Sequence, residues 1–231
     1  IINTRETMKL TDLLTPSFKA YSHSCCSLVD SCLASDSDFC QEVVSSGRLT
    51  TDQVGHATRR YQLGKSKSGR CIFWMIDEQG QVRDGHIGQS WVSVMLKARE
   101  TKLLSHWHVT HCLFGQHLVA QEEAALQPVC IVEKESSAVI LSELFPECIW
   151  LATVYPMNFS VYSFDCLQGH DVKLFPKTDE TMDSYLAWCE LADQARHRYQ
   201  LHVEVQDILE LHATAAQKTA RIDLADYIFS N

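Results

Sequence analysis

Short apolar runs separated by a helical repeat dominate the second half of the chain. Val129–Val132 is a continuous apolar run, β-branched at three of its four positions, which is typical of a strand buried on both faces. From Glu135 to Leu144 the apolar residues fall at helical spacing, and Cys148–Ala152 is a second apolar run. The pattern predicts a strand, a helix and a second strand parallel to the first, joined by a right-handed crossover.

The same alternation continues toward the end of the chain. Val172–Phe175 is predicted as a further buried strand and Leu201–Val205 as a strand of period two, with helices over Met182–Arg198 and Ile222–Phe229. We therefore predict an α/β fold: a small parallel sheet flanked by helices. Its inner strands are expected to be the runs that start at Val129, Cys148 and Val172.

The first half of the chain predicts helices and then a hairpin. Helices are expected over Ser17–Leu33, Asp38–Val44 and from Thr50 or Thr51 to Arg60. Cys71–Asp77 and Gln81–Ile87 flank a glycine-containing turn and predict a β-hairpin, which should pack against the α/β domain. Trp91–Lys102 predicts a helix and His108–Phe114 a strand, with another helix beginning at Gly115.

Domain boundaries are predicted at the segment rich in glycine, lysine and serine and at the start of the apolar runs. We predict a helical N-terminal region over residues 1–60, a hairpin with a helix and strand over 61–127, and an α/β domain over 128–231.

Glu133 ends the first predicted buried strand. Ligands of open parallel sheets bind beyond the carboxyl ends of the strands, which makes this carboxylate a candidate for chemistry. The alternative is a carboxylate that only favours the positive end of the following helix.

Seven segments occur in an order that resembles a known family. They are YQLGKSKSG, CIFWMID, CLFGQHL, PVCIVE, CIWLAT, VKLFP and IDLADYI, spread over about Tyr61–Ile228. The chain resembles the primase-like toprim proteins of mobile elements, and more widely the toprim domain of primases and topoisomerases. Members of that family usually carry an N-terminal zinc-binding segment, which this chain lacks. No zinc is therefore expected, and the opening IINTRETMKL suggests a truncated chain.

The resemblance implies a Mg²⁺ site at Glu133 and at an Asp-x-Asp motif after a later strand. Glu133 would be the catalytic carboxylate, and Glu133 and Asp179 would be the metal ligands. The first aspartate of that motif is replaced by Lys177, and a glycine pair expected after LAT is replaced by Val154 and Tyr155. These departures predict weak Mg²⁺ binding at most, and we expect Lys177 to bond a carboxylate where the ion would lie.

Composition and charge narrow the classes of protein. The net charge is −9: residues 1–120 hold 13 Lys and Arg against 11 Asp and Glu, and residues 121–231 hold 7 against 18. The acidic half alone would not wrap a phosphate backbone. Ten cysteines occur without a CxxC pair, several of them inside apolar runs, which favours reduced thiols and a cytoplasmic protein. No apolar run is long enough to span a bilayer.

A basic cluster around the first boundary is the candidate nucleic-acid interface. Its members are Arg59, Arg60, Lys65, Lys67, Arg70 and, on the hairpin, Arg83. They could contact phosphates, with glycines and serines offering backbone donors. The alternative is a solvated loop.

Histidines and nucleophiles give weaker patterns. His106, His108 and His111, with His117 beyond, have metal-like spacing but no acidic partner between them. No GxSxG motif or activated cysteine is indicated.

Two functions follow. We predict a degenerate toprim module that binds nucleic acid, preferentially single-stranded, or a replication or mobilisation protein, without efficient catalysis. The alternative is Mg²⁺-dependent nucleotidyl or phosphoryl transfer through Glu133 and the loop at Asp179. A protein-interaction domain using the acidic half is a third possibility.

Overall fold

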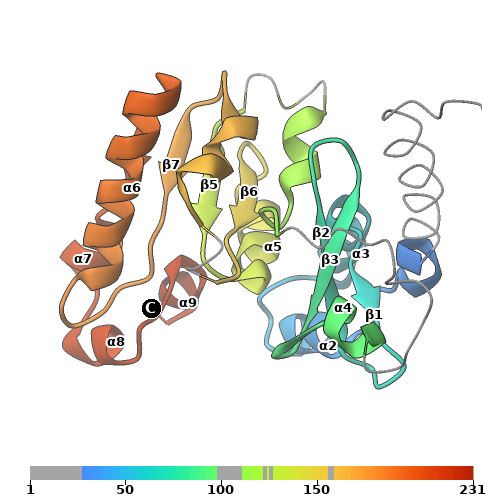
Figure 1. The fold of residues 1–231 in the computed structure, drawn as a ribbon. Coiled ribbons are helices and arrows are strands. Elements are labelled where there is room, and N and C mark those ends of the chain that lie inside the picture. Colours follow the sequence, from blue (N-terminus) through green and yellow to red (C-terminus); the bar gives the residue numbers. More distant parts are fainter. Residues whose placement is uncertain (1–27, 98–110, 122–123, 125–126, 156–158, 231) are drawn as a thin grey trace, which may run out of the picture.

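The computed structural model describes residues 28–97, 111–121, 124, 127–155 and 159–230. These residues form an antiparallel sheet of order β1-β2-β3-β4 and a parallel sheet of order β6-β5-β7-β8, flanked by helices (Figure 1). The predicted α/β fold class is confirmed. The antiparallel strands are β1 (Gly64–Lys65), β2 (Cys71–Ile76), β3 (Val82–Ile87) and β4 (Ser90–Trp91), and the parallel strands are β5 (Val129–Val132), β6 (Ile149–Ala152), β7 (Val172–Leu174) and β8 (Val203–Val205).

The helices lie between and after these strands. They are α2 (Asp38–Ser45), α3 (Thr51–Tyr61), α4 (Val92–Lys97), α5 (Glu135–Leu144), α6 (Asp183–Tyr199), α7 (Ile208–His212), α8 (Ala215–Thr219) and α9 (Leu224–Phe229), with 3-10 helices η2 (Gln116–Ala120) and η5 (Val161–Leu167). Figure 1 shows the hairpin sheet beside the β6 side of the parallel sheet and α6 at the opposite side.

Strand β5 is the centre of the fold. It pairs in parallel with β6 on one side and β7 on the other, and all four of its residues are buried. Helix α5 follows and is buried on most of its surface, because it packs against β5 and β6 and also contacts α3 and α9. The carboxyl ends of β5, β6 and β7 therefore meet at one edge, where their loops are close together.

The expectation that β6 is an inner strand is wrong, because β6 lies at the edge of the parallel sheet. Its apolar residues are nevertheless buried, since the segment before η2 covers that edge. Phe114 forms an antiparallel bridge with Ala152, and the Tyr61 hydroxyl donates to the Trp150 carbonyl at 2.8 Å. A continuous apolar run thus reports burial, not a central position in the sheet.

The hairpin of β2 and β3 packs against the α/β domain, as predicted, because His86 of β3 contacts Glu135 and Tyr155. Asp77 closes its turn by accepting hydrogen bonds from the backbone of Gln79 and Gln81. Phe73 is half-buried, with its ring centroid 5.6 Å from that of Phe114 and 5.3 Å from that of Phe39. The hairpin is stabilised by this contact instead of standing alone.

Several predictions between the hairpin and β5 are corrected. In the described part of the predicted strand over His108–Phe114, only Phe114 forms a bridge. The helix expected from Trp91 begins at Val92, and the helix after Gly115 is a 3-10 helix. Residues 1–27 and 98–110, which hold further predicted helices, lie outside the described residues.

One buried cluster extends from Cys40 to Ala225 and crosses both predicted boundaries. The division at residues 60 and 127 stays a prediction. Within the described part of the chain, none of the helices combines the length and apolar character that crossing a bilayer requires.

Candidate functional site

Glu133 lies directly beyond β5, and its carboxylate is held by Lys177. The Lys177 ammonium Nζ is 2.6 Å from Glu133 Oε2, and the two side chains are 21% and 9% exposed. Lys177 follows β7, which is the parallel neighbour of β5, so both residues emerge at the same edge of the sheet. The bond that the sequence led us to expect for Lys177 is therefore formed, with Glu133 as the partner.

The second predicted ligand, Asp179, holds the start of α6. Its Oδ1 accepts hydrogen bonds from the Thr181 and Asp183 backbone and the Thr181 hydroxyl, and its Oδ2 accepts from the Ser184 backbone. Burial would raise the pKa of Asp179, but the hydrogen bonds from Ser184, Asp183 and Thr181 outweigh it and hold the pKa well below its usual range.

These residues do not fit the Mg²⁺ ion that the resemblance implies. Mg²⁺ requires oxygen ligands that are free to turn toward it in octahedral geometry. Glu133 shares its carboxylate with an ammonium, and Asp179 directs both oxygens at the start of a helix. Among the described residues, no three His, Cys, Asp or Glu side chains are grouped as a metal site.

The loop after β6 contains a strained residue where the resemblance leads us to expect glycine. Val154 has a φ of 67°, in the left-handed region. Its N–H donates to the Glu133 carbonyl at 2.8 Å, and the Tyr155 N–H donates back to the Thr153 carbonyl at 2.8 Å. A β-branched residue is strained in such a turn, which glycine adopts freely. Val154 therefore has a backbone conformation that favours glycine.

We expect Val154→Gly to be close to neutral, within about 0.5 kcal/mol in free energy of unfolding, because relief of about 1–2 kcal/mol of strain offsets the lost packing. The matched control is Val205→Gly, at another half-buried valine outside the residues of positive φ. The control should destabilise by about 2 kcal/mol. Urea denaturation of both variants decides this, and equal losses would contradict the strain at Val154.

A second group of polar side chains lies beside this loop. The Nδ1 atom of His86, on β3, lies 2.5 Å from Oε1 of Glu135, the first residue of α5. The other ring nitrogen, Nε2, lies 3.2 Å from the Tyr155 hydroxyl. His86 and Glu135 are both buried, whereas Tyr155 is exposed. No sequence pattern indicated this group, since Glu135 and Tyr155 are 49 and 69 residues from His86 along the chain. The one available signal was a histidine at a core position of a strand.

His86 and Glu135 also line a pocket of ≈ 500 Å³ between α2, the hairpin and the start of α5. Phe39 and Phe73 supply its apolar wall, and the cations Arg70 and Lys134 face it together with the carboxylates Asp38 and Glu42. We call it the Arg70 pocket. Lys134 is paired with Asp226 at 2.7 Å, whereas Arg70 forms no ion pair with any described residue.

The predicted basic cluster divides into two groups. Lys65 is paired with Asp36 and Arg83 with Asp77, each at 2.6 Å, and Arg83 is only 20% exposed. Arg83 therefore belongs to the hairpin turn. Arg59, Arg60, Lys67 and Arg70 form no ion pair with the described residues. Arg59 and Arg60 lie in the last turn of α3, where positive charge favours the helix dipole.

The histidines do not gather as a metal site within the described residues. His111 stacks on the Trp91 ring at 4.2 Å, and His117 Nε2 lies 3.0 Å from the Arg60 carbonyl. Burial lowers the pKa of His117, so it is neutral and ties η2 to α3. His106 and His108 lie outside the described residues.

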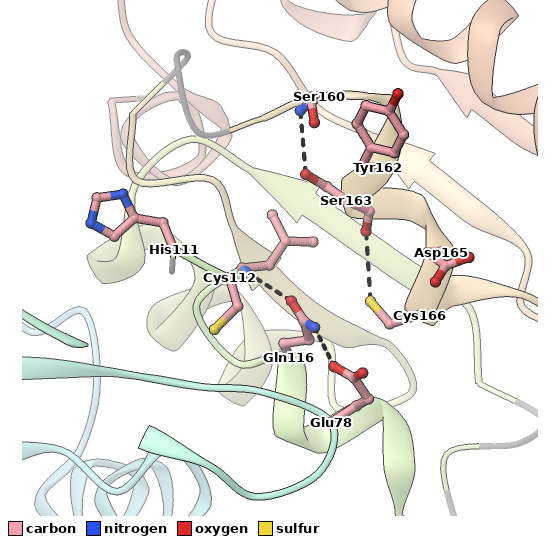
Figure 2. A pocket seen from close by; sticks show the side chains of 10 residues that line it. Glu78, His111, Cys112, Gln116, Ser160, Tyr162, Ser163, Asp165 and Cys166 are labelled. Atoms are coloured by element: carbon pink, nitrogen blue, oxygen red, sulfur yellow. Dashed lines mark hydrogen bonds between the residues drawn. The ribbon is translucent and has the colours of Figure 1, made fainter. Parts of the chain in front are cut away.

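A smaller pocket of ≈ 270 Å³ lies between the hairpin turn, η2 and η5 (Figure 2). Figure 2 shows Gln116 in its middle, donating to Glu78 and accepting from the Leu113 backbone. Burial raises the pKa of Cys166 to about 12 and that of Cys112 further still. Both thiols are protonated at neutral pH, so this pocket offers no thiolate nucleophile.

The fold and the carboxyl edge of the parallel sheet define an α/β protein. In it, Lys177 binds the Glu133 carboxylate at the end of the central strand β5. A family model described as Domain of unknown function (DUF6371) matches residues 37–178, more than half of the chain. The chain belongs to this family. The matched segment contains Glu133, Lys177 and all three members of the His86 group. No curated protein matches the chain.

Proposed function

We propose that this chain is a degenerate toprim-like module, related to the primase-like proteins of mobile elements, that binds single-stranded nucleic acid without Mg²⁺-dependent catalysis at Glu133. The observation that carries the proposal is the 2.6 Å bond between Lys177 and Glu133. It neutralises the carboxylate that would otherwise attract the ion, and a single ammonium cannot bridge phosphate oxygens as Mg²⁺ does.

Nucleic acid is favoured over a protein partner by the cations that form no ion pair within the described part of the chain. Lys67 and Arg70 lie on one short loop, and Arg70 also faces a pocket with two phenylalanine rings in its wall. A cation beside aromatic side chains suits a single strand, whose phosphates and unstacked bases are both accessible. The eight described cysteines are all free, which supports a cytoplasmic location as part of the proposal.

The test is the salt dependence of binding to a labelled single-stranded oligonucleotide, measured by fluorescence anisotropy in EDTA and in Mg²⁺. We expect binding in Mg²⁺ to be no tighter than in EDTA, because Mg²⁺ acts there only as a competing counterion, and a slope of log K against log salt that falls by about 0.7 in Lys67→Ala. The matched control is Lys65→Ala on the same loop, which should change the slope less because Asp36 already neutralises Lys65.

Two results would contradict the proposal. Tenfold tighter binding in Mg²⁺ would favour the metal-dependent alternative. No binding at low salt would favour a protein partner, since the electrostatic term is strongest there.

A further inference from the structure

We infer that Tyr155 is a nucleophile whose proton is taken by His86, and that its substrate is a phosphodiester of single-stranded nucleic acid. This goes beyond the proposed function and rests on it only for the substrate. The inference uses neither Glu133 nor a metal ion.

The carboxylate of Glu135 sets the state of the His86 ring. Glu135 Oε1 is 2.5 Å from Nδ1, and both side chains are buried. A carboxylate at that distance holds a proton on Nδ1, which leaves the lone pair of Nε2 to accept. The Tyr155 hydroxyl is 3.2 Å from Nε2 and donates to it in this tautomer. A nucleophile, a base and a group that orients the base are thus arranged in the order that nucleophilic catalysis requires.

The backbone around Tyr155 is strained in a way that fixes this contact. Val154, with its φ of 67°, forms a sharp turn between Thr153 and Tyr155. The Tyr155 ring then lies edge-on to the His86 ring, with centroids 5.5 Å apart, and 5.9 Å from the Trp91 ring. Backbone strain of this kind is concentrated at functional sites. Here the strained turn at Val154 positions the Tyr155 hydroxyl beside His86.

A substrate can reach this group from solvent, and two of its three members also line the Arg70 pocket. Tyr155 is 38% exposed, so it is open to solvent although His86 and Glu135 are not. His86 and Glu135 line the Arg70 pocket, where the Arg70 guanidinium has no described carboxylate partner. A guanidinium matches the geometry of phosphate oxygens, whereas the carboxylates of Asp38 and Glu42 in the same lining repel them, so the phosphodiester as substrate rests on the proposed function.

The reaction balances without a co-reactant. Tyr155 Oη attacks phosphorus, a tyrosine–phosphorus ester bond forms, and the bond from phosphorus to one strand oxygen breaks. His86 Nε2 takes the tyrosine proton and later returns it to solvent. The departing oxygen lies on the opposite side of phosphorus, takes a proton from water and leaves as a hydroxyl. Glu135 acts through its bond to the His86 ring, so it is a positioning residue that stabilises the transient imidazolium.

The test begins with an aryl sulfonyl fluoride, which tyrosine attacks at sulfur with loss of fluoride. Tyr162 is the internal reference, because it is 67% exposed and would react faster if exposure alone decided. We expect Tyr155 to be labelled faster than Tyr162, on the order of 10²-fold, as measured by peptide mass spectrometry. His86→Gln should remove this excess, and Glu135→Gln should reduce it, while the Tyr162 rate stays constant and reports an intact fold.

Equal labelling of the two tyrosines, or a Tyr155 rate unaffected by Glu135→Gln and His86→Gln, would overturn the inference. The second stage incubates the protein with a labelled single-stranded oligonucleotide in EDTA. We expect an adduct that survives detergent and is absent in Tyr155→Phe. Binding and fast labelling without an adduct would overturn the phosphodiester substrate. Fast labelling without binding would overturn the proposed function and leave Tyr155 as the nucleophile for another substrate.

Discussion

Replacing Lys177 with alanine should lower the free energy of unfolding by about 3 kcal/mol, because Glu133 would then be a largely buried carboxylate without its counter-charge. Urea denaturation at pH 7 measures the change. The control is Lys65→Ala, which removes an ammonium from a pair whose carboxylate side chain is 66% exposed. That substitution should be close to neutral, since exposed ion pairs add little.

A double variant separates the loss of an interaction from the cost of an unpaired charge. Lys177→Met with Glu133→Gln removes both charges and keeps similar volumes, so it should be markedly more stable than Lys177→Ala. If the double variant were the less stable protein, the ion pair itself would be the stabilising feature. If Lys177→Ala were neutral, Glu133 would have to reach solvent easily.

The same position also tests the lost metal site. Lys177→Asp puts a second carboxylate beside Glu133, and the two should repel each other until a cation binds. We expect millimolar Mg²⁺ to raise the melting temperature of this variant and to leave that of the wild type unchanged. A rise in the wild type would show that Lys177 can leave Glu133.

The sequence was most informative where a local pattern decides the structure. The run Val129–Val132 and the helical spacing that begins at Glu135 predicted β5 and α5 within a residue, since neither depends on distant contacts. Glu133 could be placed at the carboxyl edge of the sheet for the same reason. The edge position of β6 could not be predicted, because it depends on Phe114 and Tyr61 covering that strand.

Of the candidate site, the contact between Lys177 and Glu133 was predictable and the His86 group was not. The contact of Lys177 with a carboxylate followed from a resemblance that places both residues beyond neighbouring parallel strands. The group of His86, Glu135 and Tyr155 combines a hairpin strand, a helix start and a loop. Its geometry also depends on a left-handed valine, a conformation that no sequence rule assigns to valine. Non-local packing and backbone strain are therefore the two features that sequence patterns did not show.

Asp179→Ala should destabilise the fold by about 2 kcal/mol at pH 7, because it removes the acceptors at the start of α6. The loss should depend on pH. The native pKa of Asp179 lies well below its usual range, whereas the unfolded pKa is about 3.9. Its stabilising contribution is therefore complete above about pH 5 and decreases as the pH falls below about 4 toward the native pKa.

Urea denaturation of wild type and Asp179→Ala between pH 3 and pH 7 should show this directly, with a difference in stability that is constant above about pH 5 and narrows below about pH 4. Asp193→Ala on the same helix is the control. Its carboxylate is 66% exposed and bonds only Arg196 at i+3, so the variant should follow the wild type at every pH. A difference for Asp179→Ala that stays constant down to pH 3 would mean that the hydrogen bonds, not the charge, provide the stability. No difference at pH 7 would show that Asp179 is free to turn away from α6, and Asp179 would then again be available as a metal ligand.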